Sequence, residues 1–467
     1  MLKDLIQDRL KKLEEYRKKF GNPYPARTKR TMPIAEALAG FSKFLKGSKK
    51  ISLVGRATSL RGQGGILFGD FFDESGKMQF VIRKGDTKDF EEKKGLFDPG
   101  DFVQVTGSLF TTKKGEKSVL ASEIFMLSKC LRPWPSSFYG VSDEEKRHRN
   151  RYLDFIFNPE SRKKMELRTR ILSELWGAIE KDGFLEVQTP ILQPIPGGAL
   201  ARPFKTHFNA LDIDVYLRIA PELYLKRLLV AGFEKVFEIA KDFRNEGVDR
   251  DHYPEFTMLE AYWAYQDYEG MMKVTEKWIQ TAAKKAGITE VCFRGKKLQN
   301  FFKKWPEEDY GKLIKEYSGK ELKDLKTEEI DEVFKKKVRP NLIEPVFVVN
   351  YPKAISPLSK SCDDDPNLTE RFQVVVAGTE LANGFSELND PIDQRERMNE
   401  QEKKYRAGNE EATRMDEEFL EALEYGMPPA AGVGIGIDRL VAVLTDSNSI
   451  RDVMTFTNLR PKDGGRE

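Results

Sequence analysis

The stretch from Phe243 to Tyr262 constrains the fold of this chain most strongly, because its chemical character alternates along the sequence. It reads as two strands joined by a polar loop, and side chains along a strand alternate between the two faces of a sheet. The positions that share a face within each strand are Arg244, Glu246, Phe256, Met258, Glu260 and Tyr262. A face that carries these charged and polar side chains is unsuited to a hydrophobic core. It suits a site for a nucleotide phosphate, a purine ring and a cationic substrate, although a solvated face with one ion pair is the simpler alternative.

A glycine-rich stretch near the C-terminus adds a second half to this site. Gly432, Gly434 and Gly436 share one strand face and leave it without side chains, so a flat ligand can lie against the backbone. Arg439 begins the helix that follows, where backbone donors favour anions. The stretch lacks the Gly-Lys-Ser/Thr ending of a P-loop. Together with Arg244, it predicts two arginines around a nucleoside triphosphate, with Phe256 and Arg439 stacking on the two faces of adenine.

Length and composition set the general class of protein. A chain of 467 residues predicts two or three domains, and 39% hydrophobic with 33% charged residues indicates a globular protein with a sizeable core. The three cysteines are far apart and show no metal-ligand spacing, which indicates a reducing compartment. No apolar run is long enough to span a bilayer, and the N-terminus lacks a signal-peptide core. We therefore expect a cytoplasmic protein with no membrane contact.

The N-terminal part resembles a nucleic-acid-binding module in its pattern. Residues 1–50 hold 14 Lys and Arg against 5 Asp and Glu, an excess that suits RNA but is also common on solvated helices. Residues 2–20 have the periodicity of an amphipathic helix. Five short β-rich runs between residues 51 and 127 predict a small Greek-key barrel of the OB type. Arg61, Phe68 and Gln79 are candidates to face outward and meet unpaired bases, although barrel core is the simpler reading of Phe68.

A stiff, proline-containing linker around residues 130–135 separates this barrel from a second domain. We predict domains over residues 1–135 and 136–467. In the second, Asn158 and Pro159 mark the start of a helix that stops at Gly183. Strands and helices then mix without a βαβ rhythm, which predicts an α+β fold around an antiparallel sheet. The lysine-rich region 266–345 has a helical pattern and no assigned role.

These motifs resemble the class II aminoacyl-tRNA synthetases, and more closely the lysyl-tRNA synthetases. Motif 1 is similar to the helix through Trp176 and the strand ending at Pro190, motif 2 to residues 243–262, and motif 3 to residues 434–444. Residues 196–204, 220–226 and 383–390 are also family-like, so the resemblance covers nearly the whole chain. It implies an antiparallel catalytic domain preceded by an OB-fold, a homodimer, and activity with ATP, L-lysine, tRNA-Lys and Mg²⁺.

The resemblance also implies which residues bind lysine. Glu387 and Tyr262 hold the ε-ammonium, Asn383 and Arg244 hold the carboxylate, and Phe385 lines the aliphatic stem. The α-amino end is served by Glu222, Glu260 and the Gly198 carbonyl. The residue chemistry supports this substrate independently, because a pocket containing Glu260, Glu387 and Tyr262 suits an ammonium, whereas an aspartate side chain needs a cation. For Glu222 the alternative is an ordinary first-turn carboxylate on its helix.

The family resemblance also implies which residues contact ATP and Mg²⁺. By resemblance, Arg244 stabilises the α-phosphate, Glu246 contacts adenine, and His252 meets the outer phosphates, while Arg439 meets the γ-phosphate. Mg²⁺ bridges phosphate oxygens from Glu380. No side-chain nucleophile is needed, since the lysine carboxylate attacks the α-phosphate and catalysis consists of positioning and charge neutralisation.

The anticodon contacts are assigned to the barrel by the same resemblance. Phe68 stacks on an anticodon base, while Arg61, Gln79 and Glu123 read base edges.

Three departures from the family pattern stand out. Gln373 occupies the position where the family usually has a second metal-binding Glu; its neutral amide can ligate Mg²⁺ but adds no charge, so the resemblance does not fix the number of Mg²⁺ ions. Asp251 stands where a basic residue is common, with Arg250 one position earlier. Tyr253 replaces a frequent Asn, which weakens its assigned adenine contact.

Several other functions fit parts of the pattern. Aspartyl- and asparaginyl-tRNA synthetases share the barrel and the three motifs, but Glu387 and Tyr262 count against them. A synthetase-like enzyme that lysylates proteins lacks the anticodon barrel that residues 51–127 supply. A non-catalytic RNA-binding paralogue is expected to have lost Arg244 or Arg439, and both are present.

Overall fold

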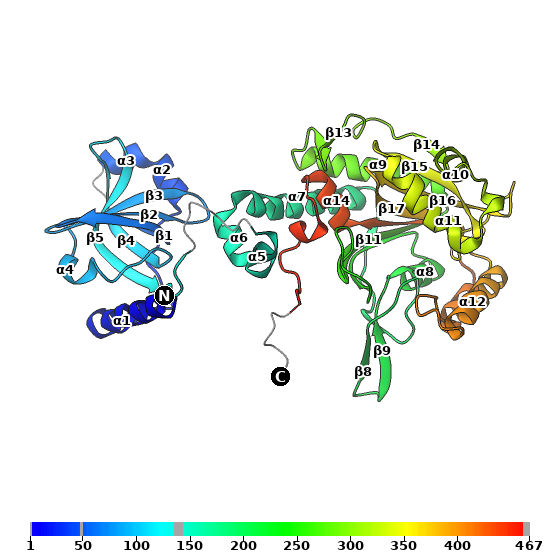
Figure 1. Cartoon of the computed structure of the whole chain (residues 1–467), viewed down its shortest axis with the longest axis horizontal. Coiled ribbons are helices and arrows are strands. Elements are labelled where there is room, and N and C mark those ends of the chain that lie inside the picture. The colour runs from blue at the N-terminus through cyan, green and yellow to red at the C-terminus, as the bar shows by residue number, and fades with distance from the viewer. Residues whose placement is uncertain (1, 47–49, 135–142, 461–467) are drawn as a thin grey trace. The chain divides into compact units, whose positions relative to one another are not determined.

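The computed structural model describes residues 2–46, 50–134 and 143–460, which belong to two compact units spanning residues 1–140 and 141–467 (Figure 1). The predicted boundary at residue 135 lies outside the described residues. No helix in the described part of the chain is long and apolar enough to cross a membrane.

The first unit is a five-stranded closed barrel, as the sequence predicts. Its strands pair in the order β1-β2-β3-β5-β4, and all neighbours are antiparallel except β3 and β5. Their bounds are β1 Ile51–Gln63, β2 Ile66–Phe72, β3 Lys77–Arg83, β4 Phe102–Thr111 and β5 Lys117–Ser128. Short helices α2 (Ile34–Ala39), α3 (Phe41–Lys46) and α4 (Phe90–Lys93) complete the unit.

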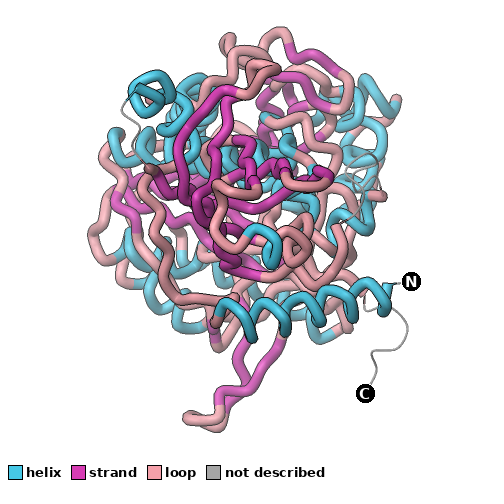
Figure 2. The backbone as a smooth tube through the Cα atoms, turned by 90° about the vertical axis from the view of Figure 1, so that its left-hand side faces the viewer, coloured by secondary structure: helices cyan, strands magenta, loops and turns pink. Residues whose placement is uncertain are grey.

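Helix α1 (Leu2–Phe20) runs as one uninterrupted helix (Figure 2) and packs against the barrel through the apolar stripe that the periodicity predicts. Leu13 and Tyr16 join the barrel core, and the Tyr16 hydroxyl accepts a hydrogen bond from the Met126 amide at 2.9 Å. The middle of the apolar stripe is thus buried, together with the basic residue Arg9, whereas Leu2 and Leu5 at the start of the helix are exposed.

The second unit is built on an eight-stranded sheet in the order β14-β15-β16-β17-β18-β11-β10-β6. Its central strands are antiparallel, and only the short edge strands pair in parallel. The bounds are β6 Leu185–Glu186, β10 Lys235–Phe243, β11 Glu255–Ala264, β14 Glu307–Asp309, β15 Val346–Pro352, β16 Leu368–Val376, β17 Thr379–Ser386 and β18 Ala430–Gly436. The antiparallel α+β fold is therefore confirmed, although the strand ending at Pro190 is only two residues long.

Three helices cover one face of this sheet: α7 (Pro159–Lys181), α9 (Tyr268–Lys285) and α14 (Ile437–Leu444). The odd-numbered residues of β11 and β18, including Leu259, Ala261, Val433 and Ile435, are buried in the core with these helices. The even-numbered residues consequently point to the opposite face. Asn158 precedes α7 and Pro159 is its first residue, as predicted.

Smaller elements surround the sheet. Helices α8 (Glu222–Val230), α12 (Pro391–Arg406) and α13 (Glu417–Glu424) lie near one end, and α8 and α13 share a second core with Val236 and Tyr262. A hairpin of β8 (Lys205–Phe208) and β9 (Ile213–Leu217), joined by β7 (Leu192–Gln193), projects away from the unit (Figure 1). The remaining elements are α5 (Glu144–Arg149), α6 (Arg151–Phe157), β12 (Val291–Phe293), β13 (Lys296–Leu298), α10 (Tyr310–Ser318) and α11 (Thr327–Val333).

Candidate active site

A cleft of about 970 Å³ opens on the face of the large sheet that the three helices leave uncovered. Every residue predicted to bind ATP, lysine or metal in the second unit lines it. These residues are Gly198, Glu222, Arg244, Glu246, His252, Phe256, Glu260, Tyr262, Gln373, Glu380, Asn383, Phe385, Glu387 and Arg439. Segments that are up to 241 positions apart in the sequence (198 to 439) therefore meet at one cavity.

The glycine face of β18 forms the floor of this cleft. Gly432, Gly434 and Gly436 pair directly with Tyr262, Glu260 and Met258 of β11, so they share the face of the side chains that line the cleft. A Cβ built at Gly432 lies 2.3 Å from Glu387 Oε1 and 2.6 Å from a Tyr262 ring carbon. A side chain there overlaps both groups, which explains physically why this position is glycine.

Arg244 and Glu246 lie beyond the strand, in contrast to the predicted strand over residues 243–247. Strand β10 ends at Phe243, the Arg244 amide still donates to the Pro254 carbonyl at 2.9 Å, and the chain then turns, with the Glu246 amide donating to the Arg244 carbonyl at 2.8 Å. The Arg244 guanidinium lies 5.0 Å from the centre of the Phe256 ring. The stacked arginine in this structure is thus Arg244, while Arg439 is engaged elsewhere.

Arg439 holds the motif 2 loop against α14. Its Nε donates to the Asp251 carbonyl at 3.2 Å, its Nη1 donates to the Glu380 carbonyl at 3.2 Å, and its Nη2 lies 3.0 Å from His252 Nε2. His252 Nδ1 in turn lies 2.9 Å from Asp249 Oδ2. The predicted phosphate ligands His252 and Arg439 are therefore neighbours.

Asp251, the acidic residue at a usually basic position, is neutralised from outside the loop. Its carboxylate forms an ion pair with Arg294, which precedes β13, and lies 3.6 Å from Arg250. The Tyr253 hydroxyl accepts a hydrogen bond from the Asn458 amide at 2.6 Å. The hydroxyl of Tyr253 therefore makes a contact within the protein, whereas the family resemblance gives this position an adenine contact.

The opposite end of the cleft concentrates buried acids. Glu222, Glu260 and Glu387 are each at most 5% exposed, and the Tyr262 hydroxyl donates to Glu260 Oε2 at 2.9 Å. Burial raises the pKa of all three carboxyl groups, that of Glu387 to about 8. Glu387 Oε1 is fully buried and has no hydrogen-bond partner among the described residues. An unpartnered acceptor beside the Gly432 backbone suits an incoming ammonium group.

Lys226, which sequence reasoning missed, is the cation within this acidic end. It is completely buried, and its Nζ lies 2.6 Å from Glu222 Oε1 and 2.5 Å from Glu387 Oε2. Burial lowers its pKa, but the charges of Glu222 and Glu387 outweigh that effect and raise it. The signal in the sequence is its position four residues after Glu222 on the predicted helix, which places the two side chains on one helix face.

Arg371 is a second missed residue. Its Nε donates to Asn383 Oδ1 at 2.8 Å, and its Nη1 donates to the Ile355 carbonyl at 2.9 Å. The guanidinium thereby orients the Asn383 amide, the group assigned to the substrate carboxylate. Strands β16 and β17 form a hairpin with a two-residue turn, but a register shift between Val374 and Val375 decides which side chains meet, and the sequence does not show that shift.

The predicted metal ligands Glu380 and Gln373 both line the cleft, with Arg339 beside them. Arg339 Nη1 lies 3.8 Å from Glu380 Oε2, and Gln373 is 7% exposed. The lysine-rich region, assigned no role from sequence, thus contributes to the site: Thr327, Glu328, Asp331, Phe334, Lys335 and Arg339 form part of the cleft wall. The helical pattern was correct for α11, but it gave no sign of which side faces the cavity.

Three of the four predicted anticodon residues, Arg61, Phe68 and Gln79, lie on one face of strands β1, β2 and β3. Phe68 pairs with Arg61, and Gln79 pairs with Asp70 on the same side, whereas Phe71 and Phe80 fill the core. Phe68 is half-buried and lies outside the core, so the barrel-core reading of Phe68 is wrong.

The exposure of these barrel residues is uneven. Gln79 is 8% exposed and accepts a hydrogen bond from Ser118 Oγ, so the expectation of an open side chain is wrong for Gln79. Arg61 is exposed and lies 2.9 Å from Asp70 Oδ2, while Glu123 is half-buried.

An antiparallel sheet with an arginine-lined cleft over a glycine strand, preceded in sequence by an OB barrel, defines the catalytic architecture of class II aminoacyl-tRNA synthetases. Comparison with known families agrees: the family described as "tRNA synthetases class II (D, K and N)" matches residues 143–460, and "OB-fold nucleic acid binding domain" matches residues 51–127. The chain therefore belongs to the class II tRNA synthetase (D, K and N) family.

Three relatives that the chain matches over most of its length are lysine–tRNA ligases. The chain is 46% identical to a lysine–tRNA ligase of Carboxydothermus hydrogenoformans, with 99% of each chain covered. It is 45% identical to the lysine–tRNA ligase of a Roseiflexus species, covering 99% of this chain and all of the relative. Against the lysine–tRNA ligase of Aquifex aeolicus the identity is 46%, over 90% of this chain and 74% of the relative.

The contact at Gly432 yields a first prediction. We expect Gly432→Ala to raise the KM for the amino-acid substrate by roughly 100-fold or more, because its methyl group displaces Glu387 Oε1 and the Tyr262 ring. Steady-state kinetics with circular dichroism as a folding check measures this.

The matched control is Gly434→Ala on the same strand face, where the nearest atom to an added Cβ is Met258 Sδ at 3.2 Å. A Gly432→Ala enzyme with the same amino-acid KM as Gly434→Ala contradicts the assignment.

Proposed function

We propose that the chain is a lysine–tRNA ligase, which activates L-lysine with ATP to lysyl-adenylate and pyrophosphate and then transfers lysine to the 3′ end of tRNA-Lys. The observation that carries this proposal is the unpartnered, buried Oε1 of Glu387 in a cleft that also holds Glu222 and Glu260. Lys226 pairs with Glu222 and Glu387, and Arg371 and Arg244 lie close enough to act on Glu222 and Glu260, but none of these cations forms a hydrogen bond with Glu387 Oε1. A substrate with two ammonium groups supplies a partner for this oxygen.

In this proposal the two ends of lysine meet different residues. The ε-ammonium binds Glu387 beside Tyr262, and the α-ammonium binds Glu222, Glu260 and the Gly198 carbonyl. The carboxylate meets Arg244 and the Asn383 amide, which Arg371 orients. Phe385 covers the aliphatic stem. The closeness of Gly198 to Glu222, with a Cβ at Gly198 only 2.8 Å from Glu222 Cβ, supports their joint role.

ATP binds over the rest of the cleft, with its adenine near Phe256 and Glu246. The lysine carboxylate oxygen attacks the α-phosphorus, the bond to the β-phosphate oxygen breaks, and pyrophosphate leaves. Arg244, placed between the lysine pocket and Phe256, stabilises the charge that develops on the α-phosphate. His252 and Arg439, already neighbours, bind the outer phosphates.

The donor set fits a Mg²⁺ ion held chiefly by nucleotide phosphates. Glu380 offers a carboxylate and Gln373 a neutral amide oxygen, both of which are ligand types that Mg²⁺ accepts. A bound Mg²⁺ neutralises phosphate charge. Arg339, 3.8 Å from Glu380, adds protein-derived positive charge where the second carboxylate of the family pattern is missing.

Features of the protein surface support the two macromolecular partners, tRNA and a second copy of the chain, and the cysteines support the location. The barrel face that carries Arg61 and Phe68 supports tRNA anticodon binding. The half-buried Glu123 is a further candidate, whereas the side chain of Gln79 is mostly buried. Exposed Leu185, Ile191 and Leu192, which lie in the motif 1 region, support a homodimer. All three cysteines are free, which supports a reducing, cytoplasmic location.

The deciding experiment is pyrophosphate exchange into ATP with each of the twenty amino acids offered separately. We expect exchange with lysine alone. Exchange with aspartate or asparagine keeps the fold assignment and rejects the pocket assignment, and no exchange at all favours a non-catalytic paralogue. In the same assay we expect Arg244→Ala to lower the rate by about 10²–10³, by analogy with the loss of one oxyanion donor, with an unchanged oligomeric state by sedimentation.

The raised pKa of Glu387 yields a pH prediction. A carboxyl group with a pKa of about 8 is mostly protonated below that pH, and the neutral form binds an ammonium weakly. The KM for lysine should therefore rise as pH falls below about 8, by up to roughly tenfold per pH unit.

Exchange kinetics between pH 6.5 and 9 measures this pH dependence, with the KM for ATP as the internal control. A lysine KM that is flat across this range contradicts the role of Glu387.

A further inference from the structure

Lys226 pairs with two of the buried glutamates at the acidic end of the cleft, but does not itself line the cavity. It lies on α8 one turn after Glu222, and its Nζ reaches Glu222 Oε1 at 2.6 Å and Glu387 Oε2, just after β17, at 2.5 Å. The ammonium also lies 5.3 Å from the centre of the Phe385 ring. Glu222, Glu387 and Phe385 line the cleft, whereas Lys226 does not. The cation is therefore placed behind the carboxylates and leaves the cavity open.

We propose that Lys226 is a positioning residue that sets the distance between the carboxylate for the α-ammonium and the carboxylate for the ε-ammonium, and so selects the chain length of the diamino acid. This inference rests on the proposed function. Two buried carboxylates without a cation between them repel one another and take up protons. An ammonium is a compact charge, so it fixes both at short distance.

Lys226→Met tests this by removing the charge while keeping the length of the side chain. We expect the KM for lysine in pyrophosphate exchange to rise roughly 100-fold, with the KM for ATP changed less than about twofold. The preference for lysine over ornithine, one methylene shorter, should fall by roughly tenfold or more, within the range that one methylene controls. Lys235→Met is the matched control, because Lys235 is half-buried in the same unit and its Nζ binds the Asp182 carbonyl outside the cleft.

Lys226→Arg separates positioning from folding. It keeps the positive charge, but its wider guanidinium holds the two carboxylates further apart. We expect a native melting temperature with a shifted lysine-to-ornithine ratio. A wild-type ratio in Lys226→Arg, or equal increases in the lysine and ATP KM values in Lys226→Met, overturns the proposal. Failure of the proposed function is distinguishable, because the unmodified enzyme then shows no lysine-dependent exchange.

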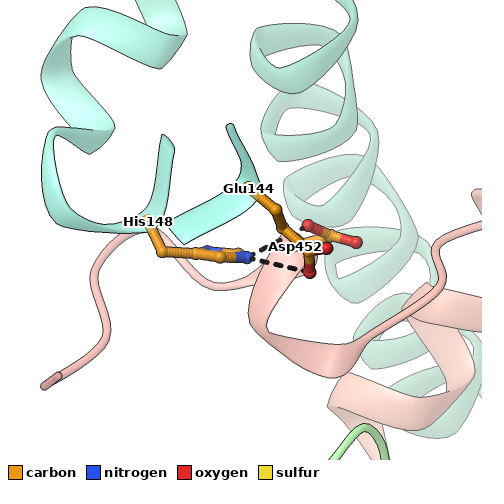
Figure 3. A group of neighbouring side chains, drawn as sticks. All are labelled: Glu144, His148 and Asp452. Carbon is orange, nitrogen blue, oxygen red and sulfur yellow. Dashed lines mark ion pairs between the residues drawn. The ribbon is translucent and has the colours of Figure 1, made fainter. Parts of the chain in front are cut away.

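A second, independent feature lies outside the cleft, where α5 meets the 3-10 turn η5 (Ile450–Val453). His148 of α5 points between the carboxylates of Glu144 and Asp452 (Figure 3). Its Nε2 lies 3.8 Å from Glu144 Oε1 and 3.5 Å from Asp452 Oδ1, and the three ligand atoms lie within 4.8 Å of one another. His148 is 5% exposed, and Nε2 has no hydrogen-bond partner among the described residues.

We propose that Glu144, His148 and Asp452 bind one Zn²⁺ ion that ties α5 to η5. Ligand bonds of about 2.0–2.2 Å place neighbouring ligand atoms about 3.5 Å apart in a tetrahedral site, which matches the observed separations after a small rotation of the exposed Glu144. An imidazole with two carboxylates favours Zn²⁺ over Mg²⁺. Arg151 lies nearby, but its guanidinium is engaged with Asp154 Oδ2 at 2.6 Å and the Asp452 carbonyl at 2.5 Å.

Isothermal calorimetry with Zn²⁺ alone, on the full chain, tests this site. We expect one Zn²⁺ per chain, lost in His148→Gln and in Asp452→Asn, together with a higher melting temperature in Zn²⁺ that His148→Gln does not show. His207→Gln is the control, because His207 is an exposed histidine that also lies 3.3 Å from two aspartates. Zn²⁺ binding that survives His148→Gln, or that is lost only in Cys292→Ser, overturns the proposal, as does the absence of binding.

Discussion

The two-residue period of β11 and β18 is the constraint on which the rest of the catalytic unit depends. Leu259 and Val433 point toward α7, α9 and α14, while Glu260 and Gly434, their direct neighbours in sequence, point into the cleft. A slip of one residue in either strand exchanges these faces and places a carboxylate in the helical core. Burial of the apolar face therefore also fixes the register of the catalytic face.

The arrangement of charged side chains is the second feature that determines what the cleft can bind. Three glutamates are buried in the cleft: Lys226 pairs with Glu222 and Glu387, while Arg371 and Arg244 act on Glu222 and Glu260. Both arginines have hydrogen-bond partners within the protein, whereas Glu387 Oε1 has none among the described residues. The protein thus leaves without a partner the carboxylate oxygen to which the proposed function assigns the ε-ammonium of the substrate.

Sequence reasoning succeeded where the signal is local and failed where the fold alone creates the contact. The alternating residues of 256–262, the glycine spacing and the five barrel strands all follow from short-range periodicity, and the structure confirms them. Arg371 reaches Asn383 only through strand pairing, and Arg339 reaches Glu380 from a different element, so no spacing predicts either contact. The strand predicted through Arg244 was too long because the chain turns at Glu246, where the Glu246 amide donates to the Arg244 carbonyl; Asn245 and Gly247 beside it are turn-forming residues that the strand prediction did not use.

The contacts that Arg439 makes with the motif 2 loop have a thermodynamic consequence for nucleotide binding. Arg439 already holds the Asp251 carbonyl and lies against His252, and Arg294 holds the Asp251 carboxylate from another element. The conformational entropy of ordering this loop is therefore lost during folding rather than on encounter with ATP. Under the proposed assignment of His252 and Arg439 to the outer phosphates, ATP replaces hydrogen-bond partners that these side chains already have. The enthalpy and the affinity of ATP binding then reflect the difference between two hydrogen-bonded states.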